Sequence, residues 1–180
     1  PADTKGGVWA SARMGLGWVA DPAIDAWWTP GKTRKAFDPT AFVQSRQTLY
    51  SLSADSTDAT PLVSALTAVT CLAAECRAEA NGGRLAVPMM VILDEAANVC
   101  PWQELPKLYS HFGSRGICLQ TILQSWSQGI DVWGETGMSK LWSASNTAVY
   151  AGGVKETDQL EKISKLIGIE RPDQISTSVS

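Results

Sequence analysis

The chain has 180 residues, enough for one domain with a substantial core, and its formal net charge of −3 at pH 7 gives no global electrostatic basis for nucleic-acid binding. Any DNA contact would therefore have to be local or shared between subunits. The four cysteines include no Cys-x-x-Cys pair and His111 is the single histidine, so neither a zinc site nor a disulfide framework is indicated, and we expect reduced thiols in a cytoplasmic protein.

Residues 1–36 differ in character from the rest of the chain. Apolar residues at three- to four-residue spacing predict a helix over about 7–19, and Asp21-Pro22 begins a second, short helix. We interpret this segment as the end of a helical (all-α) subdomain. Its tryptophans have few basic neighbours, which favours packing over stacking on nucleic-acid bases: Trp9, Trp18, Trp27 and Trp28. Residue 1 is not a start methionine, and neither a signal peptide nor a bilayer-spanning apolar stretch is evident, so we expect the chain to begin inside a longer protein.

From residue 37 onward, predicted strands and helices alternate. Strands are indicated by β-rich or unbroken apolar runs, and helices by apolar stripes at helical spacing. The predicted strands are 47–52, 89–93, 117–123 and 147–151, and the predicted helices are 61–80, 102–112, 138–143 and 156–167. This alternation predicts an α/β fold with a mostly parallel sheet, right-handed crossovers and helices on both faces.

The chain is organised around residues 87–97, where an unbroken apolar run, Met89–Leu93, ends on Asp94 and Glu95. A run without alternation is typical of a central parallel strand whose two faces are both covered. Open α/β sheets bind ligands beyond the carboxyl ends of their strands. The acidic pair has the pattern of a Walker B element, in which the Asp holds Mg²⁺ and the Glu polarises the attacking water. An ordinary strand that ends in a solvated acidic turn remains the alternative.

Two further residues flank the next predicted strand. Gln124 follows it, so we expect this amide at the same sheet edge, where it can hold the lytic water or sense a γ-phosphate; a loop or capping role is the alternative. Arg115 lies in the glycine-containing loop 113–116 at the amino end of that strand, away from its own subunit's nucleotide. In a ring it could face a neighbour's nucleotide, and a solvated loop arginine is the alternative.

The order and spacing of several sequence blocks resemble the TraG/TraD family of type IV coupling proteins. The resemblance covers most of residues 37–180. The blocks are Phe37-Asp38-Pro39, Thr48-Leu49-Tyr50, Val91-Ile92-Leu93-Asp94-Glu95-Ala96, Ser114-Arg115-Gly116-Ile117, Leu123-Gln124-Ser125 with Gln128, and Ile163-Ser164 before Leu166-Ile167-Gly168. The resemblance implies that residues 37–180 are the C-terminal part of a RecA-like P-loop NTPase domain, from Walker B onward. It also implies that this portion includes the region of TraM recognition.

A function follows from the resemblance as an expectation. It implies a homo-hexameric ATPase that uses ATP and Mg²⁺ to deliver a relaxase–DNA complex to a type IV secretion channel during conjugation. The implied partners are the relaxase or relaxosome, a TraM-type accessory protein and single-stranded DNA inside the hexamer. The implied location is the cytoplasmic face of the bacterial inner membrane, with the anchor in an N-terminal segment missing from this chain. The implied catalytic residues are Asp94, Glu95, Gln124 and Arg115, with Asp94 also as the metal ligand.

The sequence departs from the family pattern in two respects. It contains no Gly-x-x-x-x-Gly-Lys-[Ser/Thr]: Gly31-Lys32-Thr33 ends like one, but Ala26 stands where the first glycine belongs. In the family this Walker A motif lies upstream, so we expect the fragment alone to be inactive. Some members place the trans-acting arginine nearer to the position of Gly113. Two other interpretations stay open: a non-catalytic docking module for a relaxosome protein, in which the acidic pair is vestigial, and another RecA-like DNA translocase or pilus ATPase.

Overall fold

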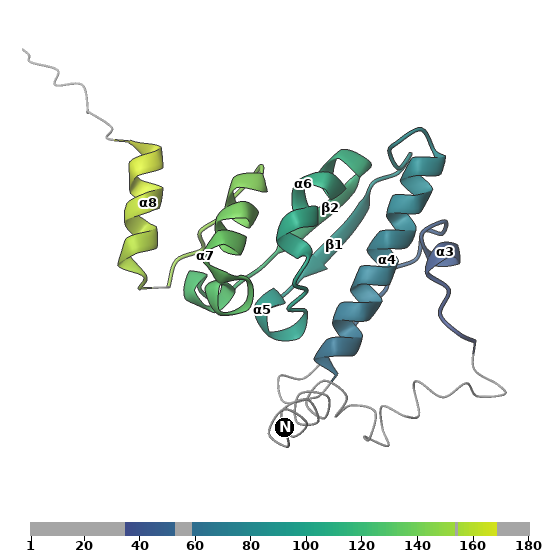
Figure 1. The fold of residues 1–180 in the computed structure, drawn as a ribbon, viewed down its shortest axis with the longest axis horizontal. Coiled ribbons are helices and arrows are strands. Elements are labelled where there is room, and N and C mark those ends of the chain that lie inside the picture. Colours follow the sequence, from purple (N-terminus) through teal and green to yellow (C-terminus); the bar gives the residue numbers. More distant parts are fainter. Residues whose placement is uncertain (1–34, 53–58, 154, 169–180) are drawn as a thin grey trace, which may run out of the picture. The chain divides into compact units, whose positions relative to one another are not determined.

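The computed structural model describes residues 35–52, 59–153 and 155–168 (Figure 1). The chain divides into two compact units, one ending at Ala148 and the other beginning at Val149. The helices and strands of the first unit are α3 (Pro39–Phe42), α4 (Thr60–Ala80), β1 (Met89–Leu93), α5 (Ala96–Val99), α6 (Leu105–Arg115), β2 (Ile117–Thr121) and α7 (Trp126–Ala144). The second unit contains α8 (Thr157–Ile167). The two helices predicted for residues 1–36, with their tryptophans, lie outside the described residues, as does Gly31-Lys32-Thr33.

The sheet of the described residues has two parallel strands, β1 and β2. Their register pairs Met89 with Ile117 and Leu93 with Thr121. Backbone bonds extend the pairing beyond both strand ends, because the amide of Met89 donates to Gly116 O at 3.0 Å and the amide of Ile122 donates to Leu93 O at 2.9 Å. The chain passes from β1 to β2 through α5 and α6, so this part of the predicted strand–helix–strand arrangement is confirmed.

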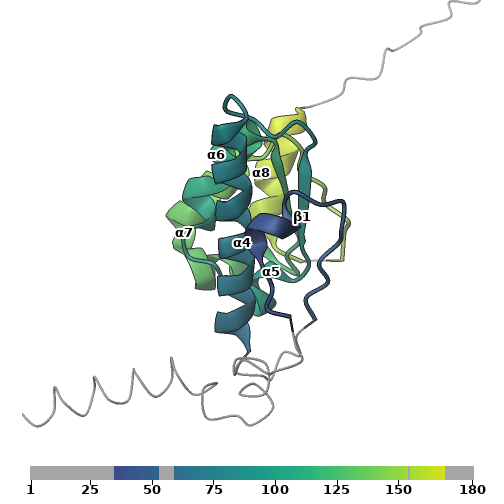
Figure 2. The ribbon, with the colours of Figure 1, turned by 90° about the vertical axis from the view of Figure 1, so that its right-hand side faces the viewer.

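Helices pack against one face of this sheet. Burial alternates along both strands: Val91 and Leu93 in β1 face the helices, whereas Met90 and Ile92 are 63% and 60% exposed. In Figure 2, α4, α6 and α7 lie on one side of β1. Among the described residues nothing covers the other face, which contradicts the expectation of helices on both faces; that expectation came from the absence of alternation in the apolar run.

The predicted RecA-like P-loop half-domain with a mostly parallel sheet is therefore wrong for the described residues, which are chiefly helical with a two-stranded sheet. Two of the predicted strands are missing. Residues 47–52 and 147–151 have no regular structure, and they leave Leu52 and Val149 95% and 86% exposed. The physical reason is that β-propensity mostly measures packing against neighbouring strands, and these two segments have no strand partner in the described chain.

The helices of the first unit begin and end largely where local chemistry predicts. Pro61 occupies the first turn of α4, where its missing N–H costs nothing, and the helix ends at Asn81. Helix α6 has Pro106 in its first turn and extends to Arg115, three residues beyond the predicted end. Gly116 then ends it with φ of 80°, in the left-handed region that favours glycine. The single histidine, His111 on α6, pairs with Glu75 on α4.

Helix α7 is much longer than the predicted helix 138–143. The hydroxyl of Ser125 caps its amino end by accepting from the amide of Gln128 at 3.2 Å. Gly134 has non-helical angles inside the helix, with φ 68° and ψ 170°, and divides it into two segments. The first part of this helix was not predicted, because the glycines of this stretch lower helix propensity and carry no side chain that could contribute to an amphipathic pattern.

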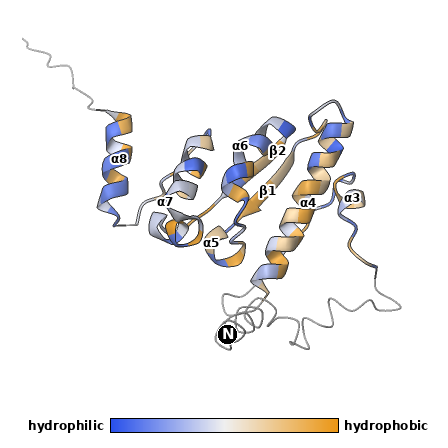
Figure 3. Cartoon of the chain, viewed as in Figure 1, coloured by the Kyte–Doolittle hydropathy of each residue, from blue (hydrophilic) through white to orange (hydrophobic). Residues whose placement is uncertain are grey.

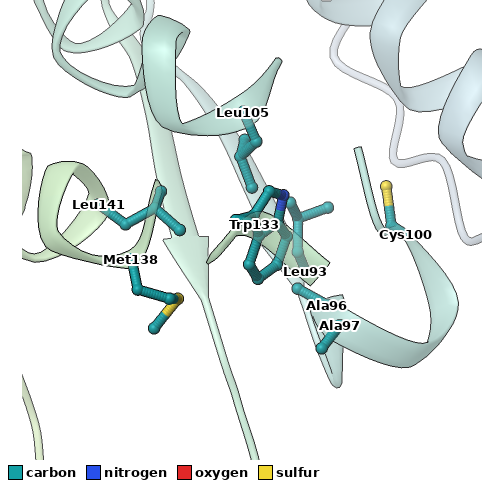
Figure 4. Packing of buried hydrophobic residues seen from close by; sticks show 8 residues of the cluster. All are labelled: Leu93, Ala96, Ala97, Cys100, Leu105, Trp133, Met138 and Leu141. Carbon is teal, nitrogen blue, oxygen red and sulfur yellow. The ribbon is translucent and has the colours of Figure 1, made fainter. Parts of the chain in front are cut away.

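Two apolar clusters form the core of the first unit. One joins β1, α5, α6 and α7, and its buried members are Leu93, Ala96, Ala97, Cys100, Leu105, Trp133, Met138 and Leu141 (Figure 4). The other joins α4 to the beginning of β2 and to α6, and its buried members are Cys71, Ala74, Ala78, Leu85, Phe112 and Ile117. The Trp133 indole donates to Trp102 O at 2.9 Å, so this large buried ring also satisfies its polar group. The first of these clusters packs the carboxyl end of β1, at Leu93, against α5 and α7.

Helix α4 is long and apolar enough to cross a membrane, judged by length and composition alone, which differs from the expectation that no stretch of the chain could span a bilayer. Core helices of water-soluble proteins pass the same test, and Cys71, Ala74 and Ala78 of α4 are fully buried in the second cluster. In Figure 3, apolar residues run along much of α4, whereas α8 carries both apolar and polar residues. Helix α8 confirms the predicted amphipathic helix, and its bounds differ from the prediction by one residue.

Candidate functional site

The acidic pair lies at the carboxyl end of β1, as the sequence predicts. Asp94 directly follows the strand and its side chain is exposed, whereas Glu95 is half-buried at the amino end of α5. The amide of Ala96 donates to Ile122 O at 3.0 Å, which holds the turn against the segment that follows β2. The two carboxylates therefore stand on a turn that is anchored on both sides.

Glu95 has a left-handed backbone conformation, with φ 49° and ψ 45°. It is the only residue other than glycine with positive φ among the described residues. This conformation costs an L-residue about 1–2 kcal/mol, and such strain is found disproportionately at functional sites. The strain turns the chain sharply from β1 into α5, and it sets the direction in which the Glu95 side chain leaves the sheet.

Gln124 meets Glu95 across the sheet edge. Its side-chain Nε2 donates to Glu95 Oε1 at 2.7 Å, a charge-assisted bond when the carboxylate is ionised. The two residues are 29 positions apart in sequence, and they meet because parallel strands end at the same edge of a sheet. The structure thus brings together two of the residues predicted for the site, Glu95 and Gln124, and exposed Asp94 directly precedes Glu95 in the chain.

Two more amides join this group, and sequence reasoning gave neither of them a role. Asn98 Nδ2 lies 3.5 Å from Glu95 Oε2, and Gln128 Nε2 donates to Asn98 Oδ1 at 2.8 Å. The side-chain oxygen of Gln128 is buried and has no hydrogen-bond partner among the described residues. The sequence spacing could have indicated that Asn98 and Gln128 belong to the site. Asn98 is one helical turn after Glu95, and Gln128 is one turn after Gln124.

Asp94 and Glu95 are the residues at this edge that could serve as ligands of a Mg²⁺ ion. Mg²⁺ is usually held by one or two carboxylates together with waters and phosphate oxygens, and an exposed Asp94 beside Glu95 fits that description. Within the described ranges, no group of three or more His, Cys, Asp or Glu side chains is placed to hold a metal ion by itself. A Mg²⁺ ion at this position would therefore need waters or phosphate oxygens to complete its ligands.

Arg115 lies at the opposite end of the strands, as the last residue of α6 and not in a loop. Its Nη1 donates to Gly83 O at 3.2 Å, and its side chain is 25% exposed. Arg84 makes the reciprocal contact, since its Nη1 donates to Gly113 O at 3.1 Å and to Ser114 O at 2.8 Å. We call this pair of arginine contacts the amino-end clasp. It joins the segment that enters β1 to the segment that enters β2.

The comparisons with known proteins agree with the sequence blocks. Residues 88–180, just over half of the chain, match a family model described as the TraM recognition site of TraD and TraG. The matched region begins one residue before β1 and includes helix α8. It also includes the side chains at the carboxyl end of the strands, which we call the sheet-edge group: Asp94, Glu95, Asn98, Gln124 and Gln128. No curated protein and no solved structure matches the chain.

Proposed function

Because this chain belongs to the family of TraD and TraG proteins, we propose that it serves in conjugation as the docking surface for a TraM-type protein of the relaxosome. The observation that supports the proposal is the match of residues 88–180 to the TraM recognition site of that family. Recognition needs an accessible surface with apolar anchors that a partner can bury. Helix α8 provides such a surface.

Helix α8 carries an apolar stripe made of Leu160, Ile163, Leu166 and Ile167. Leu166 and Ile167 are 70% and 80% exposed. On the other side of the helix, Lys165 lies 3.7 Å from Glu161 in an exposed ion pair. An amphipathic helix with an uncovered apolar stripe is a recurrent element of recognition, because the partner's groove buries residues at three- and four-residue spacing. We assign this stripe as the contact for the TraM-type protein.

The docking proposal is tested by titrating the chain with the purified TraM-type protein of the same conjugative element in a calorimeter. The double substitution Leu166→Asp with Ile167→Asp should weaken binding at least 10-fold, since it places two charges in the apolar contact. Lys165→Ala, on the opposite side of α8, is the matched control and should leave the affinity within twofold. Circular dichroism checks that each variant stays folded. If the wild-type chain shows no binding, the docking proposal is wrong. If the wild-type chain and the double variant bind with the same affinity, the assignment to α8 is wrong.

A second candidate function is nucleotide hydrolysis at the sheet-edge group, and the contact between Gln124 and Glu95 favours it. Here Asp94 is the residue that would hold Mg²⁺ on ATP, Glu95 would polarise the attacking water, and Gln124 would orient that water or sense the γ-phosphate. When bound, Mg²⁺ would neutralise developing negative charge on the phosphates. The catalytic form would be a homo-hexamer at the inner membrane that passes single-stranded DNA and relaxase to the secretion channel.

Hydrolysis is tested in the full-length coupling protein. Glu95→Gln should keep nucleotide binding and stop turnover, because the amide keeps the size of the side chain but cannot polarise water as a carboxylate does. Asp94→Asn should in addition weaken Mg²⁺-dependent binding. Wild-type rates of ATP hydrolysis in Glu95→Gln would show that the Walker B assignment is wrong.

A further inference from the structure

We infer that Asn98 and Gln128 are positioning residues for Glu95, and that they form an amide relay which connects the first turn of α7 to the Glu95 carboxylate. This inference rests on the second candidate function, hydrolysis at the sheet-edge group. It adds two residues to that site and gives each of them a role that can be measured.

The relay has a direction, which follows from its donors and acceptors. Gln128 Nε2 donates to Asn98 Oδ1 at 2.8 Å, so the oxygen of Asn98 faces α7 and its nitrogen faces Glu95. Asn98 Nδ2 then lies 3.5 Å from Glu95 Oε2. Because an amide has its donor and its acceptor on opposite branches, the first contact determines which group Asn98 offers to the carboxylate.

Glu95 is consequently held from two sides by elements far apart in sequence. Gln124 Nε2 contacts Oε1 at 2.7 Å, and Asn98 contacts Oε2. A carboxylate has about four acceptor positions, so these two contacts leave positions for a water or another ligand group. The amides thus restrict the rotation of the carboxylate without filling its capacity to accept.

Gln128 is fixed more firmly than an ordinary surface glutamine. Its backbone amide donates to the Ser125 hydroxyl at the cap of α7, and its side chain is half-buried. Its Oε1 atom is buried without a partner among the described residues. Native proteins leave few buried polar atoms unpaired, and those that persist deserve an explanation. Orientation of the Nε2 donor toward Asn98 explains this one.

The relay is tested by steady-state ATP hydrolysis in the full-length coupling protein. Asn98→Ala and Gln128→Ala should each lower kcat by about 10- to 100-fold, the range found when partners that orient a catalytic ligand are removed. KM for ATP should stay within about twofold. The double variant should be no slower than the slower single variant, because both changes interrupt one relay. Gln120→Ala and Asn146→Ala, which change exposed amides outside the relay, should leave kcat unchanged.

Gln128→Glu provides a variant of nearly the same size. The new carboxylate cannot donate to Asn98 Oδ1, so Asn98 should turn its nitrogen toward α7 and present its oxygen to Glu95. Turnover should then fall as much as in Gln128→Ala, although packing is preserved. Wild-type kcat in a folded Gln128→Glu variant would overturn the relay.

The side-chain amide signals of the 180-residue chain give a test that does not depend on hydrolysis. Gln128→Ala should shift the NMR signals of the Asn98 amide group, and Gln120→Ala should leave them in place. If the wild-type full-length protein does not hydrolyse ATP, the proposed hydrolysis fails and the catalytic role of the relay fails with it, whatever the NMR result. The relay alone is wrong if the wild type is active but the effects of Asn98→Ala and Gln128→Ala on kcat multiply in the double variant. It is also wrong if the wild type is active but Gln128→Ala does not shift the Asn98 amide signals.

Discussion

The structure gives Arg115 a different role from the one that the sequence predicts. From sequence it is a loop arginine whose loss would barely change stability, but its guanidinium donates to Gly83 O and lies 3.7 Å from Glu79 in an exposed ion pair. Hydrogen bonds from charged donors contribute about 1.5–3 kcal/mol, whereas exposed ion pairs contribute little. We therefore expect Arg115→Ala to lower the free energy of unfolding by about 1–3 kcal/mol in urea denaturation. Arg46→Ala, an exposed arginine, is the control and should change it by less than about 0.5 kcal/mol.

The same residue allows a test of a trans-acting arginine in the proposed ring of the full-length protein. An arginine finger contributes about 10³- to 10⁵-fold in rate, so its loss would nearly abolish hydrolysis. We expect Arg115→Ala alone to keep its rate of ATP hydrolysis, because Arg115 is already bonded within its own subunit. Near-complete loss of hydrolysis in Arg115→Ala, with partial recovery when its subunits are mixed with Glu95→Gln subunits, would establish a trans role and contradict this expectation.

The cysteines divide into two classes. Cys71 and Cys100 are buried and Cys76 and Cys118 are exposed. Burial, with a smaller contribution from Cys100, raises the pKa of the Cys71 thiol from 9.0 to about 12. Burial also raises the pKa of the Cys100 thiol. At pH 8 a thiol reagent should therefore label two cysteines quickly in the folded chain and all four in urea.

The raised pKa of Cys71 also predicts a dependence of stability on pH. The folded state binds the thiol proton more tightly than the unfolded state, so this contribution is fully present below pH 9. It is lost as the pH rises from 9 towards 12. The urea midpoint should fall over that range, and Cys71→Ala should make the fall shallower. A fall of equal steepness in the variant would show that other groups are responsible.

At the scale of single elements, the sharpest prediction concerns the link between α6 and β2. Gly116 has φ of 80°, and a Cβ atom there would meet only ordinary contacts, with Arg84 Cγ at 3.4 Å. The cost of Gly116→Ala is therefore conformational, about 1–2 kcal/mol in the free energy of unfolding. Gly113→Ala is the matched control, because Gly113 lies inside α6 with nothing within 4 Å of the added Cβ. It should be neutral or stabilise slightly, since alanine is the better helix former.

The success of the sequence predictions also differs from element to element. The apolar run at Met89–Leu93 gave the bounds of β1 correctly, because a run that stops abruptly at two carboxylates has clear ends. The prediction that both faces of this strand are covered was wrong, since Met90 and Ile92 are exposed. An apolar sequence determines that a strand can form, but what covers each face depends on contacts between distant segments. The strand predicted for residues 47–52 is wrong for the same reason, because this segment has strand propensity but no neighbouring strand in the described chain.

The sheet-edge group was only partly predictable. The rule that parallel strands end at one edge placed Gln124 beside Glu95. It could not reveal the left-handed backbone of Glu95 or the contacts of Asn98 and Gln128, because these depend on how α5 and α7 are packed by Trp133 and its neighbours. Arg115 was assigned to a loop because two glycines flank it, yet α6 continues through Gly113 to Arg115.

For the whole chain, the missing phosphate-binding loop leads to a clear expectation. None of the 180 residues forms a Walker A motif, so the backbone amides and lysine that cradle β- and γ-phosphates are absent. We expect the 180-residue chain to show no ATP binding by calorimetry at 100 μM protein, on the order of the concentration at which a micromolar Kd is readily detected. An unrelated P-loop ATPase that carries a Walker A motif is the positive control. Micromolar binding by the chain alone would contradict both the expectation and the idea that another segment supplies the cradle.

The amino-end clasp has a consequence for how the molecule opens. The amide of Leu85 donates to Arg115 O at 2.9 Å, in the same place where the two arginines join segments about 30 residues apart. Contacts of this kind open together as one cooperative unit, so the amide protons of Leu85 and Met89 should be among the slowest to exchange with deuterium. The turn at Asp94 and Glu95 lies at the other end of the strands, where it is held by different contacts: the amide of Ala96 donates to Ile122 O, and Gln124 donates to Glu95. The clasp therefore fixes the beginnings of both strands by contacts that do not involve the residues of the sheet edge.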